Sequence, residues 1–89
     1  MKGIITVLGQ DRVGIIARVC TYLAEHGINI LDISQTIVHG YFNMVMMVDL
    51  SGNKDSFEQT AAGLEDVGRA IGVRVKLQRE DIFDAMHRV

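Results

Sequence analysis

The sequence predicts a single α+β domain whose elements follow in the order β-α-β-β-α-β. Three observations predict it: four segments rich in β-formers, two segments with helical spacing of apolar residues, and glycines where one pattern gives way to the next. The chain has 89 residues, no proline and no block of like charges, so we expect no linker. We expect residues 1–79 to form the core and residues 80–89 a C-terminal helical extension.

The first strand is predicted over residues 2–9, because its apolar residues are mostly β-branched (Ile4, Ile5, Val7 and Leu8) and Gly9 ends the run. Over residues 12–26 the pattern becomes helical, because apolar residues recur at i, i+3, i+4 and i+7. These residues are Ile16, Val19, Cys20 and Leu23. Asp11 stands at the expected N-cap and Gly27 follows the expected last turn.

The second and third strands are predicted over residues 28–38 and 41–50, joined by a tight turn at His39-Gly40. The alternation breaks near Leu31-Asp32, which indicates a β-bulge. The third strand is apolar on both faces, so we expect it to be central.

The second helix is predicted over residues 54–71, with Gly72 at its end. Residues 73–78 then alternate strictly between apolar and polar, as in a half-exposed strand. The tail carries apolar residues along one side, which predicts a docked amphipathic helix. These residues are Ile82, Phe83, Met86 and Val89.

Two split βαβ units of this length form a ferredoxin-like sandwich, an antiparallel four-stranded sheet with two helices on one face. This topology places the second strand at a sheet edge. The face opposite the helices is predicted to carry an apolar patch, which a second copy or the tail helix would cover. The patch comprises Ile4, Thr6, Leu8, Val45 and Met47.

Composition argues against several classes of protein. A formal net charge of -2 disfavours a nucleic-acid coat or a polybasic membrane anchor. One cysteine forms no internal disulfide, no multi-cysteine metal site and no Cys-x-x-Cys copper loop. No apolar run reaches the length of a membrane span, and the first residues lead directly into a strand pattern. We expect a cytoplasmic protein with no nucleic-acid or membrane partner and no cofactor.

No residue pattern predicts a catalytic or metal site. The histidines are His26, His39 and His87, and none has a nucleophile or carboxylate at a spacing that builds a triad. Cys20 lies on the apolar stripe of the first helix and is expected to be a buried small hydrophobe. Asp81, Asp84 and His87 share a helical spacing, but a solvated face explains it better than a metal. We therefore expect no metal and no enzyme.

The stretch from Gly9 to Ala17 carries the most information. It joins the first strand to the first helix, whose free N–H groups favour an anion such as an α-carboxylate. Gly14 has no Cβ, so another molecule can approach the first turn closely. Asp11 is suited to bind an ammonium group, and Arg12 is suited to bind a carboxylate. The alternative is that Asp11 only caps the helix and Gly14 only relieves packing.

Residues 11–19 (DRVGIIARV) and 23–30 (LAEHGINI) make the chain resemble the ACT domain, a small regulatory module of amino-acid metabolism. The resemblance covers nearly the whole chain. Residues 32–36 and 82–86 are similar in particular to the stand-alone, single-domain ACT proteins of microbes. The Asp-Arg-x-Gly-Ile pattern also resembles ACT segments of the glycine-cleavage regulator and of formyltetrahydrofolate deformylase.

The resemblance implies a ligand at a subunit interface, between the first loop of one copy and the start of the second strand of another. The implied residues are Gly9, Asp11, Arg12, Val13, Gly14 and Ile15 of the loop, and Asn29 and Ile30 of the neighbour. Serine-binding members carry histidine and asparagine where this chain has Gly9 and Asp11, so an amino-acid site is implied without serine specificity.

The function implied is that of a non-catalytic, homodimeric small-molecule sensor whose state a partner enzyme or regulator reads. The alternative is an oligomerisation module with a vestigial ligand site.

Overall fold

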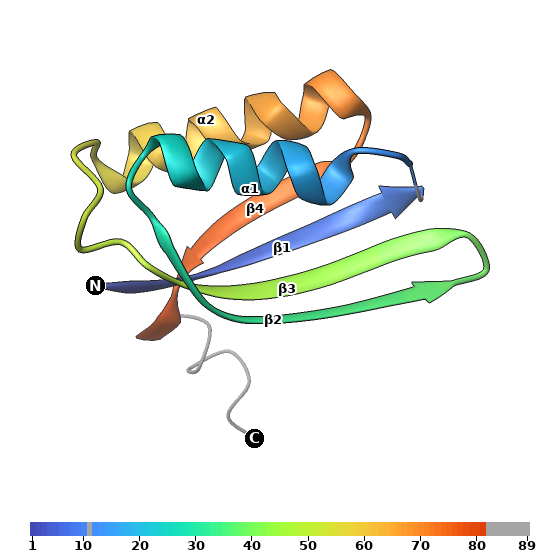
Figure 1. Cartoon of the computed structure of the whole chain (residues 1–89), viewed down its shortest axis with the longest axis horizontal. Coiled ribbons are helices and arrows are strands. Elements are labelled where there is room, and N and C mark those ends of the chain that lie inside the picture. The colour runs from blue at the N-terminus through green and yellow to red at the C-terminus, as the bar shows by residue number, and fades with distance from the viewer. Residues whose placement is uncertain (11, 82–89) are drawn as a thin grey trace.

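The computed structural model describes residues 1–10 and 12–81, and its elements follow in the predicted order (Figure 1). They are β1 (Lys2–Gln10), α1 (Ile15–Glu25), β2 (Asn29–Val38), β3 (Tyr41–Asp49), α2 (Phe57–Ile71) and β4 (Arg74–Arg79). The strand order is β2-β3-β1-β4 and every neighbouring pair is antiparallel. The predicted ferredoxin-like sandwich is therefore confirmed.

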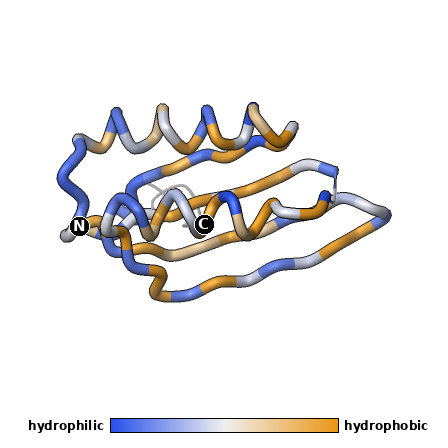
Figure 2. The backbone as a smooth tube through the Cα atoms, turned by 45° about the horizontal axis from the view of Figure 1, so that its top comes forward, coloured by the Kyte–Doolittle hydropathy of each residue, from blue (hydrophilic) through white to orange (hydrophobic). Residues whose placement is uncertain are grey.

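The helices and the sheet form two layers. Alternate residues of β1, β3 and β4 face the helices and are buried, as period-2 patterning requires. The helices contribute Ile15, Val19, Leu23 and Leu64 to the same core. Figure 2 shows hydrophobic residues recurring along the strands, with hydrophilic residues on the outer turns of the helices. In Figure 1 both helices lie toward β1 and β4, whereas β2 runs clear of them.

The hairpin and the edge strand agree with the sequence analysis. His39 and Gly40 both have positive φ, 52° and 80°, as a primed two-residue turn requires. The register of β2 on β3 shifts between Ile30 and Asp32, which confirms the predicted bulge. β2 is an outer strand and β3 a central one, as expected.

The boundaries of both helices differ from the prediction at their starts. α1 begins at Ile15 rather than Arg12, and α2 at Phe57 rather than Lys54. A capping box fixes the start of α2: the Ser56 hydroxyl accepts from the Gln59 N–H, and the Gln59 side chain accepts from the Ser56 N–H. The Ser-x-x-Gln spacing of residues 56–59 is the sequence pattern from which this helix start could have been predicted.

The predicted C-terminal helix is not among the elements of the described residues. Glu80 and Asp81 have helical backbone, and residues 82–89 lie outside the described part. The predicted apolar patch is covered at one end: Ile4 is only 4% exposed, whereas Leu8 on the same face is 50% exposed. In residues 1–10 and 12–81, no helix has the length and apolar character needed to cross a membrane.

Candidate functional site

The loop between β1 and α1 presents an uncapped helix start. Gly14 is the N-cap of α1, with φ 93° and ψ 0°, and no described side chain caps the helix. The first turn contains no acidic residue, and Arg18 N–H already bonds to the Gly14 carbonyl. Within residues 1–10 and 12–81, no side chain therefore occupies the N–H groups of the first turn, where the helix dipole favours negative charge.

The predicted cap of α1 is wrong. Asp11 was expected at the N-cap, but the helix starts with Gly14 as its cap, and Asp11 itself lies outside the described residues. The start is later because Val13 and Gly14 form a turn, and the positive φ of Gly14 is not a helical conformation.

Gly14 is required by its backbone rather than by packing. A Cβ placed on it would meet nothing within 4 Å, so the packing alternative is wrong. Its positive φ is a conformation that favours glycine. The space beside the first turn of α1 is open to another molecule.

The other predicted loop residues have different surroundings. The Val13 side chain is fully exposed, whereas Ile15 is buried in the core and offers a ligand only its N–H. The Arg12 guanidinium carbon lies 3.4 Å from where a Cβ on Gly72 would stand. Gly72 is the C-cap of α2, so the charge of Arg12 lies beside the negative end of that helix.

Gly9 has no room for a side chain. A Cβ there would lie 2.8 Å from Cγ1 of Val73, the buried residue that precedes β4. Beneath the loop, the buried Val73 therefore takes the space that a side chain at position 9 would need.

Asn29 and Ile30 lie at the other end of α1 from this loop (Figure 1). The 11 residues of α1 separate the two groups by about 16 Å along the helix. Asn29 is exposed and pairs with Asp49 across the β2–β3 ladder, while Ile30 is half-buried. One chain therefore does not bring together all the predicted site residues.

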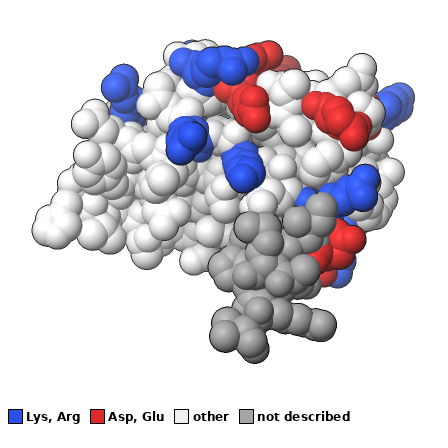
Figure 3. Space-filling view, turned by 180° about the vertical axis from the view of Figure 1, so that it is seen from behind, with Lys and Arg blue, Asp and Glu red and all other residues white. Residues whose placement is uncertain are grey.

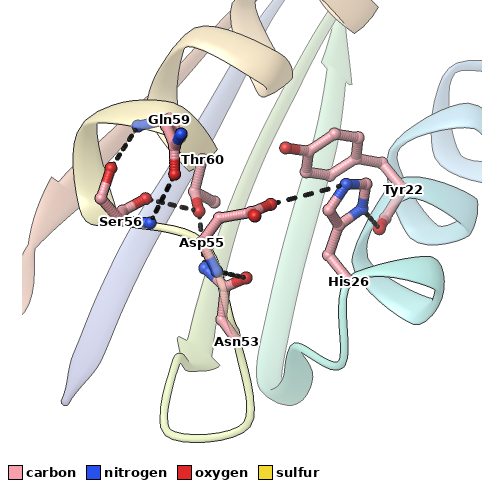
Figure 4. A network of polar contacts seen from close by, with 7 residues as sticks. All are labelled: Tyr22, His26, Asn53, Asp55, Ser56, Gln59 and Thr60. Carbon is pink, nitrogen blue, oxygen red and sulfur yellow. Dashed lines mark hydrogen bonds and ion pairs between the residues drawn. The ribbon is translucent and has the colours of Figure 1, made fainter.

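A polar network that the sequence analysis missed holds the end of α1 just before Asn29 (Figure 4). The His26 ring stacks on the Tyr22 ring with centroids 3.9 Å apart, and its Nδ1 donates to the Tyr22 carbonyl at 2.8 Å. Nε2 of His26 lies 3.8 Å from Oδ2 of Asp55, in the loop before α2. Burial, with the charge of Asp55 adding to it, raises the pKa of Tyr22. The sequence pattern that could have indicated this network is the pair of ring side chains, Tyr22 and His26, four residues apart on the predicted helix.

Neither a metal site nor a reactive thiol emerges from the described residues. No group of three or more His, Cys, Asp or Glu side chains gathers in residues 1–10 and 12–81. Asp84 and His87 lie outside these residues. Cys20 is half-buried and packs against the core rather than being fully buried.

The family of the chain follows from comparison with known proteins. The family model described as the ACT domain matches residues 3–78. The chain belongs to the ACT domain family. ACT domains are regulatory modules that bind small molecules.

Full-length relatives and solved structures agree with this assignment. A UPF0237 protein of Bifidobacterium longum is 60% identical over 88 residues, which cover 99% of this chain and 98% of the relative. The solved ACT domain protein from Streptococcus pneumoniae is 42% identical, with a TM-score of 0.83 and 98% of each chain covered. The regulatory subunit of aspartate kinase from Thermus thermophilus is 30% identical, with a TM-score of 0.67 over 89% of this chain and 51% of that one.

Proposed function

We propose that this ACT domain is a non-catalytic sensor that binds an amino acid between two copies of the chain and presents the resulting dimer to a partner enzyme or regulator. The dimer has two equivalent sites, and each combines the start of α1 from one copy with Asn29 and Ile30 from the other. The observation that carries the proposal is the separation of these two groups in one chain, together with the exposed edge strand that relates them.

β2 has the properties of an interface strand. It is an outer strand of 10 residues, and only Ile30 among them is even half-buried. Ile33 and Ile37, on the helix-facing side, are 44% and 57% exposed. An outer strand presents unpaired N–H and C=O groups, and this strand carries one charge, Asp32, and no proline or lysine to discourage pairing. Pairing with a second β2 would satisfy these groups and cover the isoleucines.

Antiparallel pairing of β2 with itself relates the two halves of the site. The β-ladders place Val38 beside Tyr41 and Tyr41 beside Gln10, so the far end of β2 lies at the end of the sheet where the loop begins. In a two-fold antiparallel pair, the first residue of one β2 lies at the last residue of the other. Asn29 of a second copy is therefore brought to the loop end of the first.

The chemistry of the two halves suits an amino acid. The free N–H groups at the start of α1 favour an α-carboxylate. The Asn29 side-chain oxygen accepts a hydrogen bond from an ammonium or hydroxyl group. Because Val73 fills the space beside Gly9, no side chain at position 9 hydrogen-bonds a hydroxyl of the ligand, which supports a ligand other than serine.

Output through a partner is supported by the family and by a solved structure. The ACT domain model matches residues 3–78, and ACT domains are regulatory modules. The similar aspartate kinase chain is itself described as a regulatory subunit.

Calorimetric titration with each of the twenty amino acids, on protein whose mass is measured by light scattering, tests the proposal. We expect a dimer and at least one heat of binding that Asn29→Ala abolishes. The matched control is Asn43→Ala, an exposed asparagine on β3. A folded dimer that gives no heat of binding with any of the twenty amino acids would contradict the proposal. The chain would then be an oligomerisation module with a vestigial ligand site.

A further inference from the structure

A hollow of about 590 Å³ opens along β4, at the edge of the sheet opposite β2. Thr6 of β1 and Arg74 and Lys76 of β4 line its sheet wall, and Glu65 and Arg69 of α2 line its helix wall. This volume is within the range of small-molecule sites. A dimer formed through β2 would leave the hollow open.

The two cations of the sheet wall point to one face. Lys76 is registered with Thr6 and Arg74 with Leu8, so these side chains share the face of the sheet that the helices leave open. Residues two apart on a strand lie about 7 Å apart, close enough for both side chains to reach one bound anion. Figure 3 shows Lys and Arg side chains standing on a mostly white surface on this side of the molecule.

Neither Arg74 nor Lys76 has an ion-pair partner within residues 1–10 and 12–81. Arg69, by contrast, pairs with Asp66 on its own helix, so its charge is already matched. The sheet wall therefore presents two positive charges that form no ion pair with the described residues, beside the Thr6 hydroxyl. Glu65 on the helix wall carries one negative charge, so the positive potential of the hollow is concentrated at the sheet wall.

The charge and chemistry of these walls select a class of ligand. A phosphate monoester carries about -1.5 to -2 at pH 7, which matches two cations better than a single carboxylate does. The guanidinium fork of Arg binds phosphate oxygens in pairs, and a hydroxyl such as that of Thr6 donates to a third. Leu8, half exposed beside Arg74, offers apolar surface to the organic part of the molecule.

We propose that this hollow is a second ligand site, which binds a small phosphate monoester. The phosphate lies on Arg74, Lys76 and Thr6, and the organic group lies on Leu8. This site lies at the edge of the sheet opposite β2, and Val73, which also lines the hollow, lies between it and Gly9 of the first loop.

Titration of the isotopically labelled full chain, followed by amide NMR, tests the proposal with phenyl phosphate, inorganic phosphate and benzoate. We expect phenyl phosphate to cause saturable shifts centred on Thr6, Leu8, Arg74 and Lys76, and to bind more tightly than benzoate. The double variant Arg74→Gln/Lys76→Gln should weaken phenyl phosphate binding by about tenfold or more. The matched control is Arg18→Gln/Lys54→Gln, which removes the same charges from exposed positions outside the hollow and should change the affinity less than about twofold.

The proposal is overturned if phenyl phosphate gives no saturable shift in the hollow up to about 20 mM. It is also overturned if the control variant weakens binding as much as the test variant, since the effect is then one of net charge. Benzoate binding as tightly as phenyl phosphate would refute the phosphate class. Circular dichroism of each variant shows that a lost shift does not come from a lost fold.

Discussion

Val73 occupies the space that a side chain on Gly9 would need. A Cβ on Gly9 would lie 2.8 Å from Cγ1 of Val73 and 3.2 Å from its Cα. Because the Cα belongs to the backbone, rotation of the valine alone does not make room. Position 9 therefore offers no side chain to a ligand beside this loop.

Adding a methyl group at position 9 should destabilise the fold through this contact. We expect Gly9→Ala to lower the free energy of unfolding by about 1–3 kcal/mol, the usual cost of overpacking. In Gly9→Ala/Val73→Ala the loss should be smaller than the sum of the two single losses, because Cγ1 is gone. Urea denaturation at fixed protein concentration measures the cycle, and a Gly9→Ala protein as stable as the wild type would contradict the crowding.

A single charge on the exposed edge of β2 should prevent dimer formation without unfolding the chain. We expect Ile37→Lys to be monomeric, because lysine on an outer strand opposes pairing. Its fold should persist, since the Ile37 side chain is 57% exposed. Light scattering and circular dichroism measure the two effects. Val45→Lys, on the open face of β3, is the control and should remain dimeric; a dimeric Ile37→Lys protein would place the interface elsewhere.

The contacts of His26 should differ greatly in strength. His26→Ala loses the stack on Tyr22 and the hydrogen bond to its carbonyl, so we expect a loss of about 1–2 kcal/mol in unfolding free energy. The 3.8 Å pair with Asp55 joins side chains that are 32% and 42% exposed, so its coupling should stay below about 0.5 kcal/mol. A double-mutant cycle of His26→Ala and Asp55→Ala measures this coupling energy. A coupling energy above about 1 kcal/mol would contradict the expectation that the ion pair is weak.

Asp49, opposite Asn29, should titrate below an ordinary aspartate. Hydrogen bonds from the Ser51 hydroxyl and N–H, at 2.5 and 3.0 Å, lower the pKa of its carboxyl. A lowered pKa in the folded state stabilises the protein above the unfolded value, and this contribution is lost as pH falls below about 4. Ser51→Ala should raise the pKa of Asp49 in an NMR titration, whereas Ser34→Ala should leave it unchanged. An unchanged pKa of Asp49 in the Ser51→Ala variant would contradict the assignment of the lowered pKa to the Ser51 hydroxyl.

Most of the fold could be predicted from local patterns. The strands, the hairpin at His39-Gly40 and the bulge after Ile30 each leave a signal within a few residues, since alternation and positive φ are local properties. The start of α1 could not be predicted in this way, because the turn at Val13-Gly14 depends on how the chain passes from the sheet to the helix layer. The burial of Ile4 is likewise a property of tertiary packing.

The candidate site was less predictable than the fold. Asn29 and Gly14 could be singled out by type and position, but their separation by the length of α1 follows only from the folded chain. The reason for glycine at position 9, contact with Val73, joins residues far apart in sequence. The hollow along β4 left no motif, because its lining comes from three separate elements.

Subunit complementation tests the shared amino-acid site most directly. Asn29→Ala removes one half of the site, and Gly14→Asn fills the other, since asparagine tolerates positive φ and its side chain would cover the free N–H groups. Each variant alone should give no heat with the amino acid that the wild type binds. An equimolar mixture, refolded together, should regain about a quarter of the wild-type sites, because half of randomly formed dimers carry one intact site. A mixture as silent as its two components would contradict a site built from two copies.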